Sequence, residues 1–151
     1  MKGFVEDYTA AHGENSAGAQ ITMADVEIAV VTGAASGIGH AIALRLAQDY
    51  SLINVDINKA NLEKVEQEII ANGGKVHSII GDVSERETHI KAREWASATG
   101  TLTAWVNCAG WTRGAALHAF PNDSRVFEEL IGTNQNGTFW GCAEALHSFV
   151  N

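Results

Sequence analysis

The stretch IAVVTGAASGIG, residues 28–39, decides how this sequence folds. It begins with a run of β-branched and small apolar residues over 28–32, which is typical of a buried strand, and residues 33–39 carry three glycines. An amphipathic pattern follows, in which Ile38, Ile42, Leu44 and Leu46 stand among alanines. The stretch therefore predicts a strand, a tight turn and a helix.

The glycines of this turn indicate a site for an anion. Glycine allows the backbone to turn with positive φ and lets a ligand approach without a Cβ in the way. The free N–H groups and the dipole at the start of the following helix favour a negative group such as a pyrophosphate. A strand-to-helix turn without any ligand is the alternative, because glycines serve tight turns for purely structural reasons as well.

Composition describes an ordinary globular protein and excludes several classes of function. The chain has 151 residues, of which 46% are hydrophobic and 19% charged, with a formal net charge of −8. The negative charge and the scattered Lys and Arg argue against nucleic acid or an anionic membrane as partner. No apolar run approaches the roughly 20 residues that span a bilayer, and the N-terminus does not resemble a signal peptide. We therefore expect a cytoplasmic protein.

The cysteines and histidines give no sign of a metal site. Cys108 and Cys142 lie far apart in sequence, which indicates two reduced thiols, and the six histidines show no ligand spacing. The histidines are interpreted as surface or packing residues, and no metal is expected.

The first 25 residues lack sustained periodicity and predict a flexible N-terminal extension, with one folded unit over residues 26–151. Met23 lies just before the first strand, so the preceding residues could belong to a start-site artefact. The expected elements follow in order: a first strand–turn–helix unit over 26–50, a strand over 51–56, a helix over 59–71, a strand over 75–81, a helix to about residue 98, a strand over 102–106, and a last helix to about residue 148.

Local signals mark several boundaries of these elements. Asn72-Gly73-Gly74 is a helix stop, and Ser84-Glu85-Arg86-Glu87 has the pattern of a capping box. After a loop over 111–121, a cap at Asn122, Asp123 or Ser124 is expected to open the last helix. Its predicted inner face consists of Val126, Phe127, Leu130 and Ile131, and the glycines inside it, Gly132, Gly137 and Gly141, indicate close packing against another segment.

The regular alternation of strands and helices predicts an α/β fold, a doubly wound parallel sheet with helices on both faces. In such sheets ligands lie beyond the carboxyl ends of the strands, at the topological switch point. Four distinctive segments follow the predicted strands and would converge there: 33–39, Asp56, Asp82-Val83 and 107–110. This convergence favours a dinucleotide site over a purely structural turn.

Asp56 indicates which dinucleotide is bound. It follows Gly39 by about 20 residues, the spacing of a carboxylate that binds the adenosine ribose. A carboxylate at this place repels a 2′-phosphate, and no Arg stands in the glycine turn or directly after Asp56. We therefore expect NAD rather than NADP, with a helix-capping role for Asp56 as the alternative.

These residues together resemble the short-chain dehydrogenase/reductase family. Thr32 to Gly39 matches its T-G-x-x-x-G-I-G turn, and Asn107-Cys108-Ala109-Gly110 is similar to its N-N-A-G, with Cys108 in place of the second Asn. Gly81-Asp82-Val83 and Asn134-Gln135-Asn136-Gly137 resemble two further family segments. The resemblance implies a Rossmann-like fold and NAD(P)-dependent alcohol–carbonyl oxidoreduction. It implies one catalytic residue, Asn134, and cofactor contacts at Gly33, Ser36, Gly37, Ile38, Gly39, Asp56, Asp82, Val83, Asn107, Ala109 and Gly110.

The sequence departs from the family at its acid–base pair. In the family a Tyr-x-x-x-Lys pair does the proton transfer, whereas Tyr8 and Tyr50 here have no Lys four residues on. The expected sheet is thus a half-domain that ends after the fourth strand and its helix. Three interpretations stay open: the cofactor-binding part of an alcohol or carbonyl oxidoreductase, an inactive nucleotide-binding module, and a partner-binding remnant. The last helix is the expected surface for a homo-oligomer.

Overall fold

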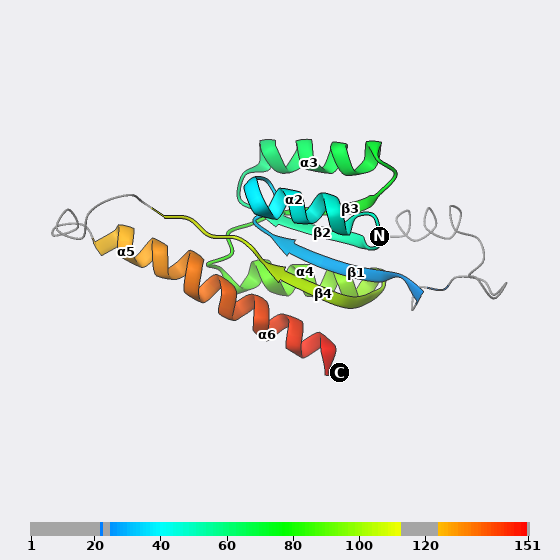
Figure 1. The fold of residues 1–151 in the computed structure, drawn as a ribbon. Helices are drawn as coiled ribbons and strands as arrows, with labels where there is room; N and C mark the ends of the chain where they lie inside the picture. Colours follow the sequence, from blue (N-terminus) through cyan, green and yellow to red (C-terminus); the bar gives the residue numbers. More distant parts are fainter. Residues whose placement is uncertain (1–21, 23–24, 113–123, 151) are drawn as a thin grey trace.

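The computed structural model describes residues 22, 25–112 and 124–150 of the chain. Four strands form one sheet in the order β3-β2-β1-β4, and every neighbouring pair is parallel. The arrowheads in Figure 1 accordingly point to the same side of the molecule. The predicted parallel α/β sheet is confirmed.

The predicted elements lie close to their expected bounds as far as the fourth strand. The strands are β1 (Glu27–Thr32), β2 (Ser51–Asp56), β3 (Lys75–Ile80) and β4 (Thr101–Asn107), and the helices between them are α2 (Gly37–Leu46), α3 (Lys59–Ala71) and α4 (Arg86–Thr99). Most of the N-terminal extension expected over residues 1–25 lies outside the described residues.

Two apolar layers enclose the sheet, because successive side chains of β1 face opposite sides. Ile28 and Val30 pack with residues of α4, whereas Ala29 and Val31 pack with residues of α2 and α3. Figure 1 shows α2 and α3 covering one face, and α4 and α6 (Gly137–Phe149) lying on the other. Both faces of the sheet are therefore covered, as a parallel sheet requires.

The order of the strands places a crevice beside β1. From β1 the chain moves outward to β2 and β3, and it then returns across the sheet to β4 on the other side of β1. Adjacent connections thus diverge from the carboxyl ends of β1 and β4. This is the switch point at which open α/β sheets bind ligands.

The last helix differs from its prediction in two ways. It is interrupted by a π-helical turn, η3 (Ile131–Asn136), between α5 (Ser124–Leu130) and α6. Its expected inner face is also partly wrong, because Val126 is buried whereas Phe127 is 61% exposed. In Figure 1 α5 extends past the carboxyl ends of the strands, so no strand lies beneath it to cover both sides of its apolar stripe.

The predicted capping box at the start of α4 is wrong. The residue that caps α4 is Glu85, and it makes no side-chain cap hydrogen bond. Ser84 instead lies one step earlier in a turn made by Asp82, whose Oδ1 accepts the Ser84 N–H at 2.8 Å. In a capping box the side chain of Glu87 would accept the Ser84 N–H, but Asp82 accepts this N–H instead.

Close packing at the glycines of α6 is confirmed. A Cβ added at Gly137 would lie 3.0 Å from the Val83 side chain, and one at Gly141 would lie 2.9 Å from Trp105 Nε1. These glycines let α6 approach β4 and the loop after β3. The helix therefore reaches the crevice at the carboxyl end of the sheet.

Candidate functional site

A pocket of about 880 Å³ lies at the carboxyl ends of the strands. Its walls come from the loop after each strand and from α5 and η3. Ten of the residues expected at a cofactor site line it: Gly33, Ser36, Gly37, Ile38, Gly39, Asp56, Asp82, Val83, Ala109 and Gly110. The structure thus brings together residues from all four segments that the sequence singled out.

Each glycine of the first turn is required for a different structural reason. Gly33 has φ +70°, and a Cβ there would lie 2.6 Å from the Ala109 Cα. Gly39 lies directly against the backbone of Gly33. Gly37 has φ +53° and nothing within 4 Å of its Cβ position, so it faces open space at the pocket. Two glycines therefore close the turn, and the third leaves room beside it.

The backbone N–H groups before the helix are already engaged. Gly33 N and Ala34 N donate to Val55 O, and Ala35 N donates to Asp56 Oδ2 at 2.9 Å. Ser36, the N-cap of α2, makes no side-chain cap hydrogen bond within the part of the chain that the structure describes. The first N–H groups of α2 lack intrahelical partners, as in any α-helix, and they lie at the pocket. They suit an anionic group.

Asp56 ends β2 at the edge of the pocket, with both carboxylate oxygens in use. Oδ2 accepts from Ala35 N, and Oδ1 accepts from Asn58 N at 2.8 Å. The cap of α3 is Asn58, whose side chain accepts from Asn61 N at 3.1 Å. The helix-capping alternative for Asp56 is therefore wrong, and its carboxylate instead joins the glycine turn to the end of β2.

Thr32 joins the glycine turn to the end of β4. Its buried Oγ1 accepts from Cys108 N at 3.1 Å and from Ala109 N at 3.2 Å. This contact fixes the distance between the two loops that flank the switch point. The Thr of the glycine motif thus has a structural task of its own.

The loop after β3 is held from below by a buried histidine. His89 Nε2 donates to Val83 O at 2.8 Å. Burial lowers the pKa of His89, and this effect outweighs the hydrogen bond to Val83 and the charge of Glu144, both of which raise it. The ring therefore supports the loop in its neutral form.

Two predicted site residues do not line the pocket. The side chain of Asn107 is turned toward α6, accepting from Trp105 Nε1 at 3.0 Å and donating to Cys142 Sγ at 3.5 Å. Asn134 lies in η3 and pairs with the backbone of Trp111, donating to its O at 2.9 Å and accepting from its N at 3.0 Å. Asn134 thereby fixes the start of the loop that follows Gly110.

Sequence reasoning did not identify several other lining residues. Ile57, Gly81, Ser84, Cys108 and Trp111 adjoin predicted site residues, so a wider window around each motif would have included them. The remaining four, Glu128, Glu129, Gly132 and Thr133, come from α5 and η3. Gly132 was expected only to pack closely against another segment, and no local signal marks the other three, because only the return of this helix across the sheet brings them to the pocket.

Neither a metal cluster nor a membrane-spanning helix occurs among the described residues. No group of three or more His, Cys, Asp or Glu there is arranged to hold a metal ion. None of the helices in those ranges is long and apolar enough to span a membrane.

Comparison with known proteins agrees with this geometry. The family model for short chain dehydrogenase matches residues 27–151. The chain is 37% identical over 115 residues to the uncharacterized oxidoreductase YxbG of Bacillus subtilis (strain 168), covering 74% of this chain and 41% of that protein. It is 34% identical over 126 residues to the uncharacterized oxidoreductase Lmo0432 of Listeria monocytogenes serovar 1/2a, covering 82% and 50%.

Solved structures show the same fold. A 3-ketoacyl-ACP reductase from Sinorhizobium meliloti 1021 superposes with a TM-score of 0.71 at 30% identity, over 81% of this chain and 48% of that one. A metagenomic short-chain oxidoreductase in complex with NADP gives 0.74 at 28% identity, over 82% and 57%. The chain spans about half the length of the curated relatives described above. By its matched residues and its fold, the chain belongs to the short-chain dehydrogenase family.

Proposed function

We propose that the pocket binds NAD and that the protein to which this chain belongs is an alcohol–carbonyl oxidoreductase. The observation that supports the proposal best is the convergence of the glycine turn, Asp56, Asp82-Val83 and the loop after β4 on one pocket. These segments follow four different strands, and the pocket is the place where they meet. Dinucleotide binding is the function that uses all of them.

The residues present suit the parts of such a cofactor. The N-terminus of α2, with open space at Gly37, would hold the pyrophosphate. Asp56 would accept hydroxyl groups of the adenosine ribose, and Asp82-Val83 would contact the adenine. Ala109 and Gly110 would lie along the cofactor toward its nicotinamide end. We propose that Asn107 also contacts the cofactor there, through its backbone.

The charges around the pocket support NAD over NADP. Its lining includes four carboxylates, those of Asp56, Asp82, Glu128 and Glu129, and no Lys or Arg of the described ranges 25–112 and 124–150 lines it. The negative charge of a 2′-phosphate would be repelled by these carboxylates, and no Lys or Arg of the described lining would offset the repulsion. One solved relative is in complex with NADP, so tighter binding of NADP than of NAD is the result that would contradict this preference.

Hydride transfer is the chemistry that a bound nicotinamide supplies, and the chain has to manage the accompanying proton. Tyr50 packs in the apolar layer under α2 and α3 and is not among the pocket residues, and Tyr8 lies outside the described residues. Asn134, proposed to hold a water in a proton relay, cannot itself act as the acid. We therefore propose the oxidoreductase activity for the whole protein, with a small alcohol or carbonyl as substrate.

The alternative is an inactive nucleotide-binding or partner-binding fragment. The absence of a Tyr-x-x-x-Lys pair from these 151 residues is what favours it. A cytoplasmic location and association of two copies through the last helix also remain proposals. The exposed apolar residues of α6, Phe139, Leu146 and Phe149, support the association.

Calorimetric titration of the chain with NAD and with NADP tests the proposed function. We expect saturable binding of NAD at one site and weaker binding of NADP. Absence of binding of either nucleotide would contradict the function, and equal affinities would contradict the cofactor preference alone.

A further inference from the structure

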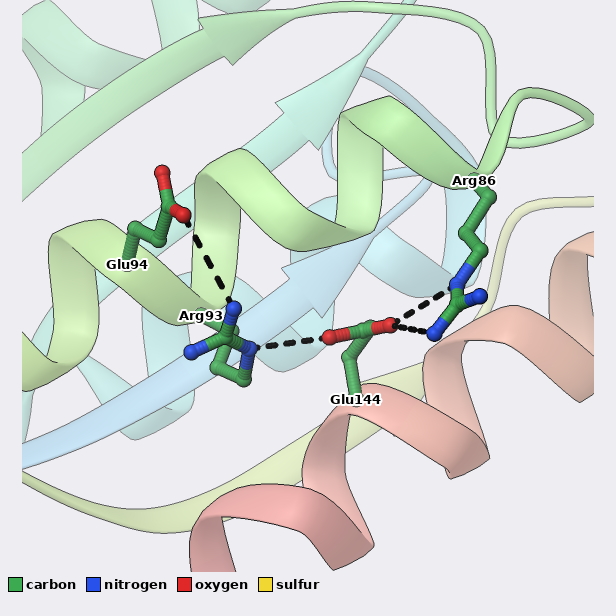
Figure 2. A network of polar contacts seen from close by, with 4 residues as sticks. All are labelled: Arg86, Arg93, Glu94 and Glu144. Atoms are coloured by element: carbon green, nitrogen blue, oxygen red, sulfur yellow. Dashed lines mark hydrogen bonds and ion pairs between the residues drawn. The ribbon is translucent and has the colours of Figure 1, made fainter.

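An ion-pair cluster outside the pocket joins α4 to α6. Figure 2 shows the carboxylate of Glu144, on α6, between two arginines of α4. Arg86 approaches Oε1 with Nε at 3.1 Å and Nη2 at 3.0 Å, and Arg93 approaches Oε2 with Nε at 2.8 Å. Each oxygen of Glu144 therefore has an arginine of its own.

The cluster is buried at its centre and open at its rim. The side chain of Glu144 is 5% exposed and that of Arg93 20%, whereas that of Arg86 is 57% exposed. Burial alone would raise the pKa of Glu144. The hydrogen bonds and charges of Arg93 and Arg86 lower this pKa by more than burial raises it, so that the net shift is downward. A buried carboxylate with two arginine partners holds a fixed geometry, because moving away from both would leave its charge buried without compensation.

The cluster stands directly behind one wall of the pocket. Arg86 is the first residue of α4 and follows Val83 and Ser84, which both line the pocket. The same two residues are approached by α6, which carries Glu144, and by η3, which directly precedes it. A Cβ at Gly137 would lie 3.0 Å from the Val83 side chain, and one at Gly132 would lie 3.3 Å from Ser84 Cβ. The spacing between the loop after β3 and η3 is therefore set by how closely α6 lies on α4.

We propose that Glu144 is a positioning residue for the adenine end of the nucleotide pocket. It fixes α6 against α4 and thereby sets the distance between Val83-Ser84 and η3. This inference rests on the proposed function, since it takes Asp82-Val83 to be the adenine contact. The glycine turn at residues 33–39 leads into α2, which lies on the opposite face of the sheet from α4 and α6, and no residue of the cluster contacts it through a hydrogen bond or ion pair given above.

Glu144→Gln tests the proposal, because it keeps the size of the side chain and removes its charge. One arginine would then face the amide N–H groups instead of an acceptor. Glu94→Gln is the matched control: Glu94 contacts the same Arg93, at 3.8 Å, but its side chain is 64% exposed (Figure 2). The ligand is ADP-ribose, which carries the adenine end of the cofactor without the nicotinamide.

We expect Glu144→Gln to weaken ADP-ribose binding by about 5- to 10-fold in calorimetry, and Glu94→Gln to leave it within about twofold. Amide hydrogen exchange should become faster at residues 81–86 and 131–137 and stay unchanged at 33–39. Unchanged affinity would overturn the proposal. Exchange that rises equally in the glycine turn would overturn it too, since Glu144 would then serve only general stability.

Arg86→Lys provides a second variant should Glu144→Gln fail to fold. It keeps the positive charge at an exposed position and replaces the contact of two nitrogens with one, so a smaller loss in the same direction is expected. No loss in this variant would contradict the proposal. If the unmodified chain does not bind ADP-ribose, the proposed function falls and this inference with it, whereas equal binding by all variants overturns this inference alone.

Discussion

At the scale of single residues, Asp56 combines two tasks in one carboxylate. It stands where the ribose of a dinucleotide is expected, and it also accepts the N–H groups of Ala35 and Asn58. A residue with both tasks cannot be exchanged for cofactor preference alone, because the glycine turn depends on it.

Asp56→Ala should therefore change affinity and preference together. Removing the carboxylate leaves two backbone donors without their acceptor, which costs about 1.5–3 kcal/mol for each hydrogen bond to a charged group. NAD affinity should fall by at least tenfold, while the ratio of NAD to NADP affinity narrows because the repulsion of the 2′-phosphate is gone. Calorimetry with both nucleotides measures the two effects, with Asp56→Asn as the control that keeps one acceptor oxygen. A ratio that stays the same would show that Asp56 does not set the preference.

Gly37→Val should abolish most nucleotide binding without unfolding the chain. Its side chain would fill the open space at the pocket, and its positive φ would add about 1–2 kcal/mol of strain. Gly73→Val is a matched control, because Gly73 also has positive φ and open space but lies in the turn between α3 and β3. Thermal unfolding should show similar losses of stability for the two variants, and only Gly37→Val should lose NAD binding. Equal NAD affinity in both would mean that the turn serves the fold alone.

The site residues that sequence could predict are those whose position follows from one strand end. Each lies at the carboxyl end of a strand or a few residues beyond it, and parallel strands bring these ends together, as for Gly33, Asp56, Asp82 and Gly110. The side chain of Asn107 could not be placed in this way. Its contact with Cys142 spans 35 residues and depends on how closely α6 approaches β4.

At the scale of elements, α4 supports the loop after β3 through a hydrogen bond from the ring of His89. The ring is buried with Nε2 bound to Val83 O, and its Nδ1 has no hydrogen-bond partner among the described residues. His77 on β3 stacks on Trp95 of α4 with 3.5 Å between ring centroids. Burial lowers the pKa of both histidines.

These lowered pKa values predict that the chain loses stability in mild acid. A histidine with a lower pKa in the folded than in the unfolded state contributes stability above its unfolded pKa, and this contribution is lost as pH falls toward the folded pKa. The free energy of unfolding should thus fall below about pH 6.5, by at most about 1.4 kcal/mol per pH unit for each histidine. Urea unfolding between pH 5 and 8 measures this slope. His89→Gln, whose amide can still donate to Val83 O, should reduce it, and an unchanged slope would contradict a role for His89.

Helix periodicity predicted α3 to the residue but was wrong about Phe127. In α3 the apolar stripe of Leu62, Val65 and Ile69 lies on the sheet and is buried. The stripe of α5 has no sheet beneath it, so that Val126 is buried, Leu130 is half-buried and Phe127 is exposed. Periodicity identifies the apolar side of a helix, but what covers that side is decided by contacts distant in sequence.

At the scale of the whole molecule, one sheet carries two apolar layers and a pocket at one end. The elements that build the pocket carry the residues proposed above for the adenosine and pyrophosphate of a dinucleotide. Among the described residues neither a Tyr nor a His lines the pocket, and the titratable side chains that do are four carboxylates and the Cys108 thiol. Binding and turnover are therefore expected to separate in this chain.

We expect no alcohol or carbonyl turnover from these 151 residues alone. Hydride transfer to a carbonyl leaves an alkoxide, and a positioned acid typically contributes about 10²–10⁴-fold to such a step. The measurement follows the absorbance of the reduced nicotinamide with a panel of secondary alcohols and ketones. A rate that scales with protein concentration and disappears in Gly37→Val would contradict this expectation, and His118, which lies outside the described residues, would be the next residue to replace.

The π-helical turn η3 makes the pocket sensitive to chain length. A π turn accommodates about one residue more than an α turn. Deleting one residue, such as Gln135, would let α5 and α6 run as one α-helix and would rotate α5 by about 100° about the common axis. Glu128 and Glu129 would then leave the pocket, although every one of their side chains is kept. The position of the rim formed by α5 thus depends on the number of residues in η3, which a substitution leaves unchanged.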